Sequence, residues 1–541
     1  MFKKPWVKIV LGLVAVGFLA VLMAPLFVNA DAFRPMLENK LSSALGRRVT
    51  LGKLSLSLFT RSVVADQLTV GDDPAFSSTP FLQAKSLKIG VHLRPLFFHH
   101  QIKVKKFVAE SPEIQLISND HGVWNYASLG RGTPGMDQAA HGDDTEIFVG
   151  IAEIDNGKVV VSSLPSKGQP FVYDAVNITA DNVSFGHVIP FSLTAKLPGD
   201  GSVALSGTAG PLNEQDASAT PLNAQLTVRK FDPVKSGVVP ASAGIGMEAD
   251  IDAQLKSDGK TATSTGTLVA QHLLLAKNGT SAPNPVHVTY KVQDDLKAQT
   301  GDVKDLAIET GPVTVHAQGT FAMTGPATTV NLHLNAMKVP VDAVEALLPA
   351  VGVRLPTGSQ LKGGTLTAQL AITGTATAPV IAGPVEVDNS QLAGFDLGSK
   401  IQGLTGLTGT RGGTEIQVLH ADVHETPAET QLTNINCVVP AIGTATGAGT
   451  VAESGALNFQ LTVKLSGSGA AGAAAGAAAA ALDGVAGNLL HTAANASVPL
   501  TITGTTSNPV IRADVKAMMR GSAGSAAKKG LGNLLQGLVP K

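Results

Sequence analysis

A nine-residue stretch near the C-terminal end, LNFQLTVKL at residues 457–465, alternates apolar and polar side chains without a break. Successive side chains of a β-strand point to opposite faces of its sheet, so the pattern predicts a strand with one apolar face and one polar face. The apolar face would carry Leu457, Phe459, Leu461, Val463 and Leu465.

The same alternation recurs along most of the chain, at residues 54–59, 87–93, 191–197 and 330–334 among others, and Gly, Asn and Asp punctuate it. Two segments nearly repeat each other, ITGTATAPVI at 372–381 and ITGTTSNPVI at 502–511. We therefore predict a mainly β protein, with an elongated, curved and repetitive antiparallel sheet shaped as a groove and a few short helices. The alternative for the repeats is that Gly-Thr pairs are simply common in a Gly-rich β chain.

The N-terminus predicts export. Residues 9–28 carry no charge, which is long enough for a transmembrane helix, and Lys3, Lys4 and Lys8 place the preceding tail in the cytoplasm. A signal peptide cleaved after Ala30 is the alternative, and it would export the rest of the chain as well. A helix should follow from Asp31, with an apolar stripe at Phe33, Leu37, Leu41 and Leu45.

The C-terminal residues differ from the strands before them. Residues 466–481 are an Ala/Gly tract that could be a linker or a poorly anchored helix. Near the end of the chain, four leucines with helical spacing predict a basic amphipathic helix that lies on a membrane or packs on its own sheet. They are Leu531, Leu534, Leu535 and Leu538.

These patterns predict eight consecutive segments. They are a cytoplasmic tail (1–8), a transmembrane helix (9–28), an N-terminal region of helix and strands (31–129), a linker (130–146), a repetitive β-groove (147–465), an Ala/Gly-rich segment (466–497), closing strands (498–514) and a C-terminal amphipathic helix (515–541).

Composition and motifs argue against several functions. The 40 basic and 41 acidic residues balance, so we expect no nucleic-acid partner. Phosphate-binding loops, HExxH and nucleophile elbows are absent, and the single cysteine, Cys437, excludes a multi-cysteine metal site. His420, Asp422 and His424 could share one face of a strand, but ligands spaced along a flat strand diverge, which favours a solvated face. We expect no catalytic residue, metal or cofactor, and no enzymatic activity.

The first 130 residues or so resemble the N-terminal region of AsmA-like proteins. After the lysines, the apolar span and the amphipathic segment come GRRV (46–49), FLQAKSLKI (81–89), LRPL (93–96), SPEI (111–114) and HGVWN (121–125). IDNGKV at 154–159 and SVPL-x-ITGT at 497–505 resemble later parts of that family, whereas residues 200–450 match only in texture.

The resemblance implies a single-pass protein of the bacterial inner membrane, with its bulk in the periplasm and a role in outer-membrane biogenesis. Longer relatives are thought to carry phospholipid along a β-groove, and the family has no known catalytic residues. A long sheet with an aliphatic face and few helices to cover it suits acyl chains, so the five apolar residues of 457–465 become candidate lipid-facing residues. The expected partners are a phospholipid membrane, lipid acyl chains and envelope or outer-membrane proteins.

Two other functions stay open. The protein could be a structural or regulatory factor that affects the targeting or assembly of outer-membrane proteins without carrying lipid. An exported enzyme is the third.

Overall fold

The computed structural model describes most of the chain. Described are residues 30–57, 62–91, 104–120, 122–129, 149–165, 169–184, 186–213, 219–277, 279–324, 327–397, 401–402, 413–465 and 497–513. The transmembrane span predicted at 9–28, the linker at 130–146 and the C-terminal helix with its four leucines lie outside the described residues. Among the residues that are described, no helix is long and apolar enough to cross a membrane.

The described chain begins with the predicted helix. A 3₁₀ turn, η1 (Ala30–Phe33), leads into α2 (Arg34–Leu45), and the helix ends where Gly46 takes a φ of 63°. Leu37, Leu41 and Leu45 pack against a buried core of the first strands, as the apolar stripe predicts. A second α-helix in the described part, α4 (Val341–Glu345), is a single turn between strands.

The contacts divide the chain into two compact units, residues 1–238 with 249–266 and 295–297, and the remainder. The strands of the first are β1 (Val49–Leu51), β2 (Leu54–Ser57), β3 (Ser62–Ala65), β4 (Leu68–Val70), β5 (Leu82–Ala84), β6 (Ser86–Val91), β7 (Val104–Glu110), β8 (Glu113–Ser118), β9 (Val149–Ser163), β10 (Phe171–Val183), β11 (Ile189–Lys196), β12 (Ser202–Ala209) and β13 (Leu222–Phe231). Residues of both units make up β14 (Gly246–Ser257), β15 (Thr261–Leu274) and β16 (Val286–Asp295).

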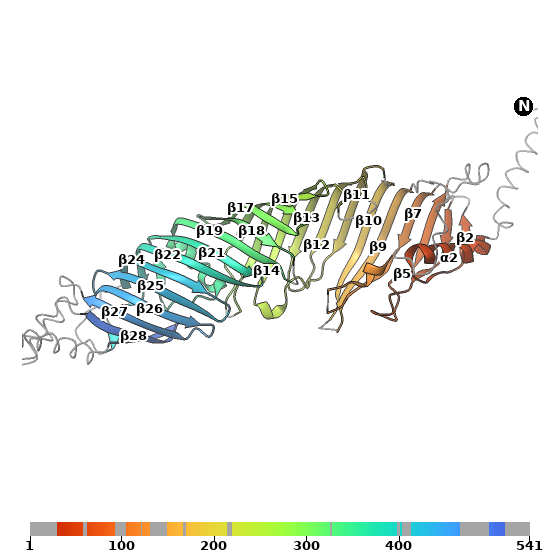
Figure 1. Ribbon diagram of the computed structural model, residues 1–541. Coiled ribbons are helices and arrows are strands. Elements are labelled where there is room, and N and C mark those ends of the chain that lie inside the picture. The colour runs from red at the N-terminus through yellow and green to blue at the C-terminus, as the bar shows by residue number, and fades with distance from the viewer. Residues whose placement is uncertain are drawn as a thin grey trace, which may run out of the picture. The chain divides into compact units, whose positions relative to one another are not determined.

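Most strands of the first unit pair antiparallel with the next strand in the sequence. From β9 to β14 each strand follows this rule, and Figure 1 shows β9 to β13 as a succession of neighbouring strands. The exceptions are β7 and β8, which both pair parallel with β9. The strand after the predicted linker thus shares backbone hydrogen bonds with the strands before it.

The predicted alternation is confirmed in these strands. On β11, Ser192 and Thr194 are exposed on one face, whereas Phe191 and Leu193 on the other are half-buried. Leu193 pairs with Leu205, and Leu205 with Leu226, so the apolar residues form a row across three strands. This face is only partly covered, as expected for a sheet with few helices.

The long strands bend at β-bulges. The register shifts after Asp174 in β10 and after Val228 in β13, and Ala175 and Lys230 there have φ values of 49° and 50°. A bulge adds a residue to one strand and increases its local twist, which curves the sheet. The period-two pattern of the sequence does not reveal these positions.

A buried polar network ties the first loops together. Arg47 donates hydrogen bonds to Asp72 (3.3 Å), to the Asn125 carbonyl (2.9 Å) and to the Ser128 hydroxyl (2.6 Å). The fully buried Asn125 side chain donates to Asp72 Oδ2 and to a β8 carbonyl, and it accepts from a β8 N–H. The quoted GRRV and HGVWN segments, about 75 residues apart, therefore meet around one arginine.

Acid should weaken this region. The Ala75 backbone N–H and the Ser128 hydroxyl lower the pKa of Asp73, and hydrogen bonds from Lys88 and Ser86 lower the pKa of Glu110. A carboxyl group whose pKa is lower in the folded state adds stability above its unfolded pKa and loses it as pH falls through its folded pKa.

We therefore expect the free energy of unfolding to fall between about pH 5 and pH 2. The measurement is urea unfolding followed by Trp124 fluorescence, with Trp6, the other of the two tryptophans, replaced by phenylalanine. Asp73→Asn should flatten this dependence. Equal stability across the range in the parent protein would contradict the prediction.

The second unit contains a longer succession of strands. They are β17 (Thr300–Thr310), β18 (Val313–Ala322), β19 (Thr329–Pro340), β20 (Gln360–Lys362), β21 (Thr365–Thr375), β22 (Ala378–Ala393), β23 (Ile401–Gln402), β24 (Gly413–Glu425), β25 (Glu429–Val439), β26 (Gly443–Ala452), β27 (Leu457–Leu465), β28 (Ser497–Thr505) and β29 (Asn508–Ala513). Antiparallel pairing runs from β17 through β19, β21, β22 and β24 to β29. The two-residue strand β23 pairs parallel with β29.

The sequence repeat corresponds to a repeated hairpin. In β21–β22, Ile372 pairs with Ile381 and Thr375 with Ala378. In β28–β29, Ile502 pairs with Ile511 and Thr505 with Asn508. The register and the two-residue turn are the same, and Gly374 and Gly504 both adopt a positive φ just before the turn. The similarity of the two segments is therefore structural.

Candidate functional site

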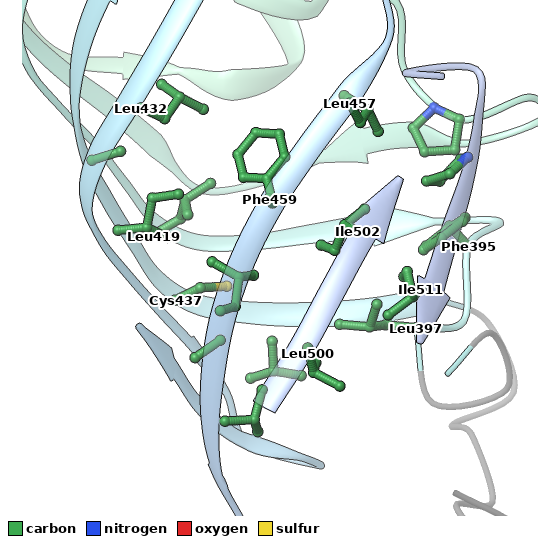
Figure 2. A pocket seen from close by; sticks show the side chains of 18 of the residues that line it. Phe395, Leu397, Leu419, Leu432, Cys437, Leu457, Phe459, Leu500, Ile502 and Ile511 are labelled. Atoms are coloured by element: carbon green, nitrogen blue, oxygen red, sulfur yellow. The ribbon is translucent and has the colours of Figure 1, made fainter. Parts of the chain in front are cut away.

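The strands at the end of the second unit surround an apolar cavity of about 490 Å³. The inward side chains come from β22, from β24 to β29 and from the segment after β22 (Figure 2). The lining consists of Arg354, Pro356, Val385, Val387, Phe395, Leu397, Leu419, Ala421, Val423, Leu432, Ile435, Cys437, Val439, Ile442, Gly443, Ala445, Leu457, Phe459, Leu461, Val463, Leu500, Ile502, Thr506, Pro509 and Ile511.

Cross-strand register brings these side chains together. Phe459 on β27 pairs with Gly449 on one side and with Ile502 on the other, and Ile502 pairs with Ile511. Residues directly opposite each other in antiparallel strands project to the same face, so each such row adds to one surface. A Cβ on Gly449 would lie 2.3 Å from the Phe459 ring, so only glycine leaves the ring room across β26.

The cavity is closed at one end and open at the other. At the closed end, Val463, Val498 and Ile511 are 4%, 0% and 3% exposed and form a packed cluster with Val439 and Ile442. Toward the other end, Leu457 and Phe459 are only half-buried. Burial thus decreases along β27 from Val463 to Leu457.

The segment after β22 supplies one wall. Thr414 fixes it, because its hydroxyl donates to the Phe395 carbonyl (2.7 Å) and accepts from the Leu397 N–H (2.9 Å). Phe395 and Leu397 lie beside Ile511 in Figure 2. The chain then pairs with β29 through residues 401 and 402. Strand β29, the last that the structure describes, is therefore held against a segment about 110 residues earlier.

A loop closes the wall beside the open end. Thr357 donates from its N–H and from its hydroxyl to the Ser507 carbonyl, both at 3.0 Å, which ties the loop to the β28–β29 turn. The Thr506 N–H donates to the Gly455 carbonyl (3.0 Å) in the β26–β27 turn. Arg354, three residues before Thr357, and Thr506 therefore belong to this end of the cavity.

Four of the five candidate lipid-facing residues, Leu457, Phe459, Leu461 and Val463, line the cavity. Leu465 pairs with Gly443, but its side chain lies outside what is described. The C-terminal leucines predicted to contact a membrane also lie outside the described residues. Sequence reasoning did not find Phe395, Leu397 and Arg354, because neither periodicity nor a motif marks them.

The residues considered for chemistry are placed on or near this site. Cys437 lines the cavity, and burial raises the pKa of its thiol to about 11, so it is protonated and unreactive at neutral pH. His420 and Asp422 alternate with the lining residues of β24 and so lie on its other face, where His420 Nδ1 is 3.6 Å from Glu386. No group of three metal-binding side chains occurs in the described part of the chain.

This arrangement provides a hydrophobic chamber rather than a reactive centre. Its walls carry almost no hydrogen-bonding groups, which is the usual character of sites for apolar ligands. A search of curated proteins and a search of solved structures found no match. The model of the AsmA family matches residues 3–186, which contain the residues that suggested the resemblance. Over this N-terminal third, the chain is identified as AsmA family.

Proposed function

We propose that the protein holds phospholipid acyl chains on the apolar faces of its sheets and supports outer-membrane biogenesis in this way, without catalysis. The observation that carries the proposal is the cavity of about 490 Å³, whose described lining contains one charged residue among 25. Each methylene group that moves from water into such a site contributes about 0.8 kcal/mol.

The strand pattern supports a larger binding surface than the cavity alone. In the first unit, the row from Leu193 to Leu226 is only half-buried, so apolar side chains remain accessible there too. The lining is mostly aliphatic, and aliphatic side chains make contacts with a methylene chain that do not depend on a specific orientation. Such a surface suits lipids of variable chain length.

The experiment is native mass spectrometry of the full chain extracted in mild detergent. Phospholipid that stays bound after detergent exchange, and that a fluorescent fatty acid displaces, would support the proposal. A protein that carries no lipid and does not bind the probe would refute it. That result would favour the alternative, a factor that affects the assembly of outer-membrane proteins without carrying lipid.

The proposed location is the bacterial inner membrane, with residues 9–28 as the anchor, the N-terminus in the cytoplasm and the bulk in the periplasm. The uncharged segment, the lysines before it and the AsmA match over residues 3–186 support this location. The partners would be the phospholipid membrane and envelope proteins, and no nucleic acid.

This topology predicts the behaviour of a reporter fused after Lys541. An alkaline phosphatase fusion should be active and should sediment with membranes, because the chain would leave the cytoplasm and stay anchored. A fusion that removes residues 1–30 should be inactive. A soluble product that starts at Asp31 would contradict the anchor and indicate cleavage.

A further inference from the structure

Arg354 is the single charged residue among those that line the described cavity, and Thr506 is its one hydroxyl neighbour in the lining. Arg354 is exposed, whereas the residues at the closed end are buried. The hydrogen bonds from Thr357 to Ser507 and from Thr506 to Gly455 place both polar residues at the open end. The cavity is therefore apolar in depth and cationic at its mouth.

This polarity matches an amphiphile in one orientation. The hydrocarbon chain would extend toward Val498 and Val463 at the closed end, and the headgroup would remain at the mouth beside the guanidinium. A neutral headgroup would gain nothing from the charge. An anionic headgroup would gain charge-assisted hydrogen bonds, which are about twice as strong as neutral ones.

We propose that Arg354 binds the phosphate of a lipid whose acyl chain occupies the cavity, and that it makes the site selective for phosphate-bearing lipids. This inference rests on the proposed function, since it specifies which chains the site accepts and how they are oriented. The guanidinium has five N–H donors in a planar fork that fits two phosphate oxygens. Arg354 also has interactions of its own within the protein, and the fork has enough donors to serve both.

The test compares two single-chain lipids with the same fluorescent acyl chain, a lysophosphatidylglycerol and a monoacylglycerol, on the full chain in detergent. Arg354→Gln should weaken binding of the phosphate lipid about tenfold or more, because hydrogen bonds to charged groups contribute about 1.5–3 kcal/mol. Monoacylglycerol binding should stay the same, which also shows that the variant is folded. Arg354→Lys should recover part of the loss.

Arg512→Gln is the matched control, because Arg512 is exposed and adjacent to Ile511 in β29 but does not line the cavity. It should change neither affinity. A fluorescent fatty acid distinguishes a carboxylate from a phosphate, and an equal loss for both anionic probes would overturn the selectivity for phosphate.

The other outcomes separate the two proposals. If both lipids bind the parent protein and Arg354→Gln changes both equally or neither, the role of Arg354 is refuted and the chain-binding function stands. If neither probe binds the parent protein, both proposals fail. If the probes bind only after removal of residues 515–541, a segment of the protein itself occupies the cavity, and the lipid assignment is wrong.

Discussion

Replacement of Arg47 by methionine is expected to destabilise the N-terminal strands by about 3–5 kcal/mol, because it leaves a buried charge without its partner. The Asp72 side chain is 0% exposed and that of Arg47 is 6% exposed. The loss also removes the donors to the Asn125 carbonyl and to Ser128. Three loops that are distant in the sequence would lose their common contact.

The measurement is the urea midpoint followed by Trp124 fluorescence, since Trp124 precedes the buried Asn125. Arg48→Met is the matched control, because Arg48 is exposed next to Arg47, and its effect should stay within about 0.5 kcal/mol. Adding Asp72→Asn to Arg47→Met should recover part of the loss. Equal midpoints for the two single arginine variants would show that the network adds no stability.

Phe459→Asp is expected to abolish binding of a fluorescent fatty acid, a loss of at least about a hundredfold. Phe459 lines the middle of the cavity, where a carboxylate has no hydrogen-bonding partner and its burial beside hydrocarbon is costly. Leu461→Asp should act in the same way. Gln460→Asp and Thr462→Asp should bind nearly as well as the parent protein, since both residues are exposed on the other face of β27.

Far-UV circular dichroism and thermal unfolding of all four variants separate binding from folding. If inward and outward variants lose structure alike, or if none changes affinity, β27 does not contact the ligand. Phe459→Leu supplies a conservative check, because it keeps the wall apolar. It should retain most of the affinity and should therefore behave unlike Phe459→Asp.

The local pattern of the sequence predicts much of the fold. The alternation at 457–465 became β27 with the expected bounds, and the leucine stripe of α2 packs on the first strands. The sheet is mainly antiparallel as predicted, but β9 pairs parallel with β7 and β8, and β23 with β29. Alternation determines which face of a strand is apolar, but it does not determine which strand becomes its neighbour.

The same limit applies to the site. Four lining residues of β27 were predicted because they repeat every second position. Phe395 and Leu397 lie in a segment without such a repeat, and a threonine 17–19 residues later fixes them. Asp72 lies in a loop, as its Gly/Pro context predicts, but its role as the partner of Arg47 depends on a contact 25 residues away. Tertiary contacts of this kind have no local signature.

The pairing of β29 with β23 has a consequence for the order in which the protein forms. Most strands pair with the strand made just before them, and such short-range contacts form quickly as the chain emerges. The wall around Phe395 must instead wait for residues made about 110 positions later. A chain whose synthesis stops before β28 would have most of its hairpins and an unfinished chamber. Completion of the chamber therefore marks the end of synthesis, and a half-made protein has no closed site in which to capture a ligand.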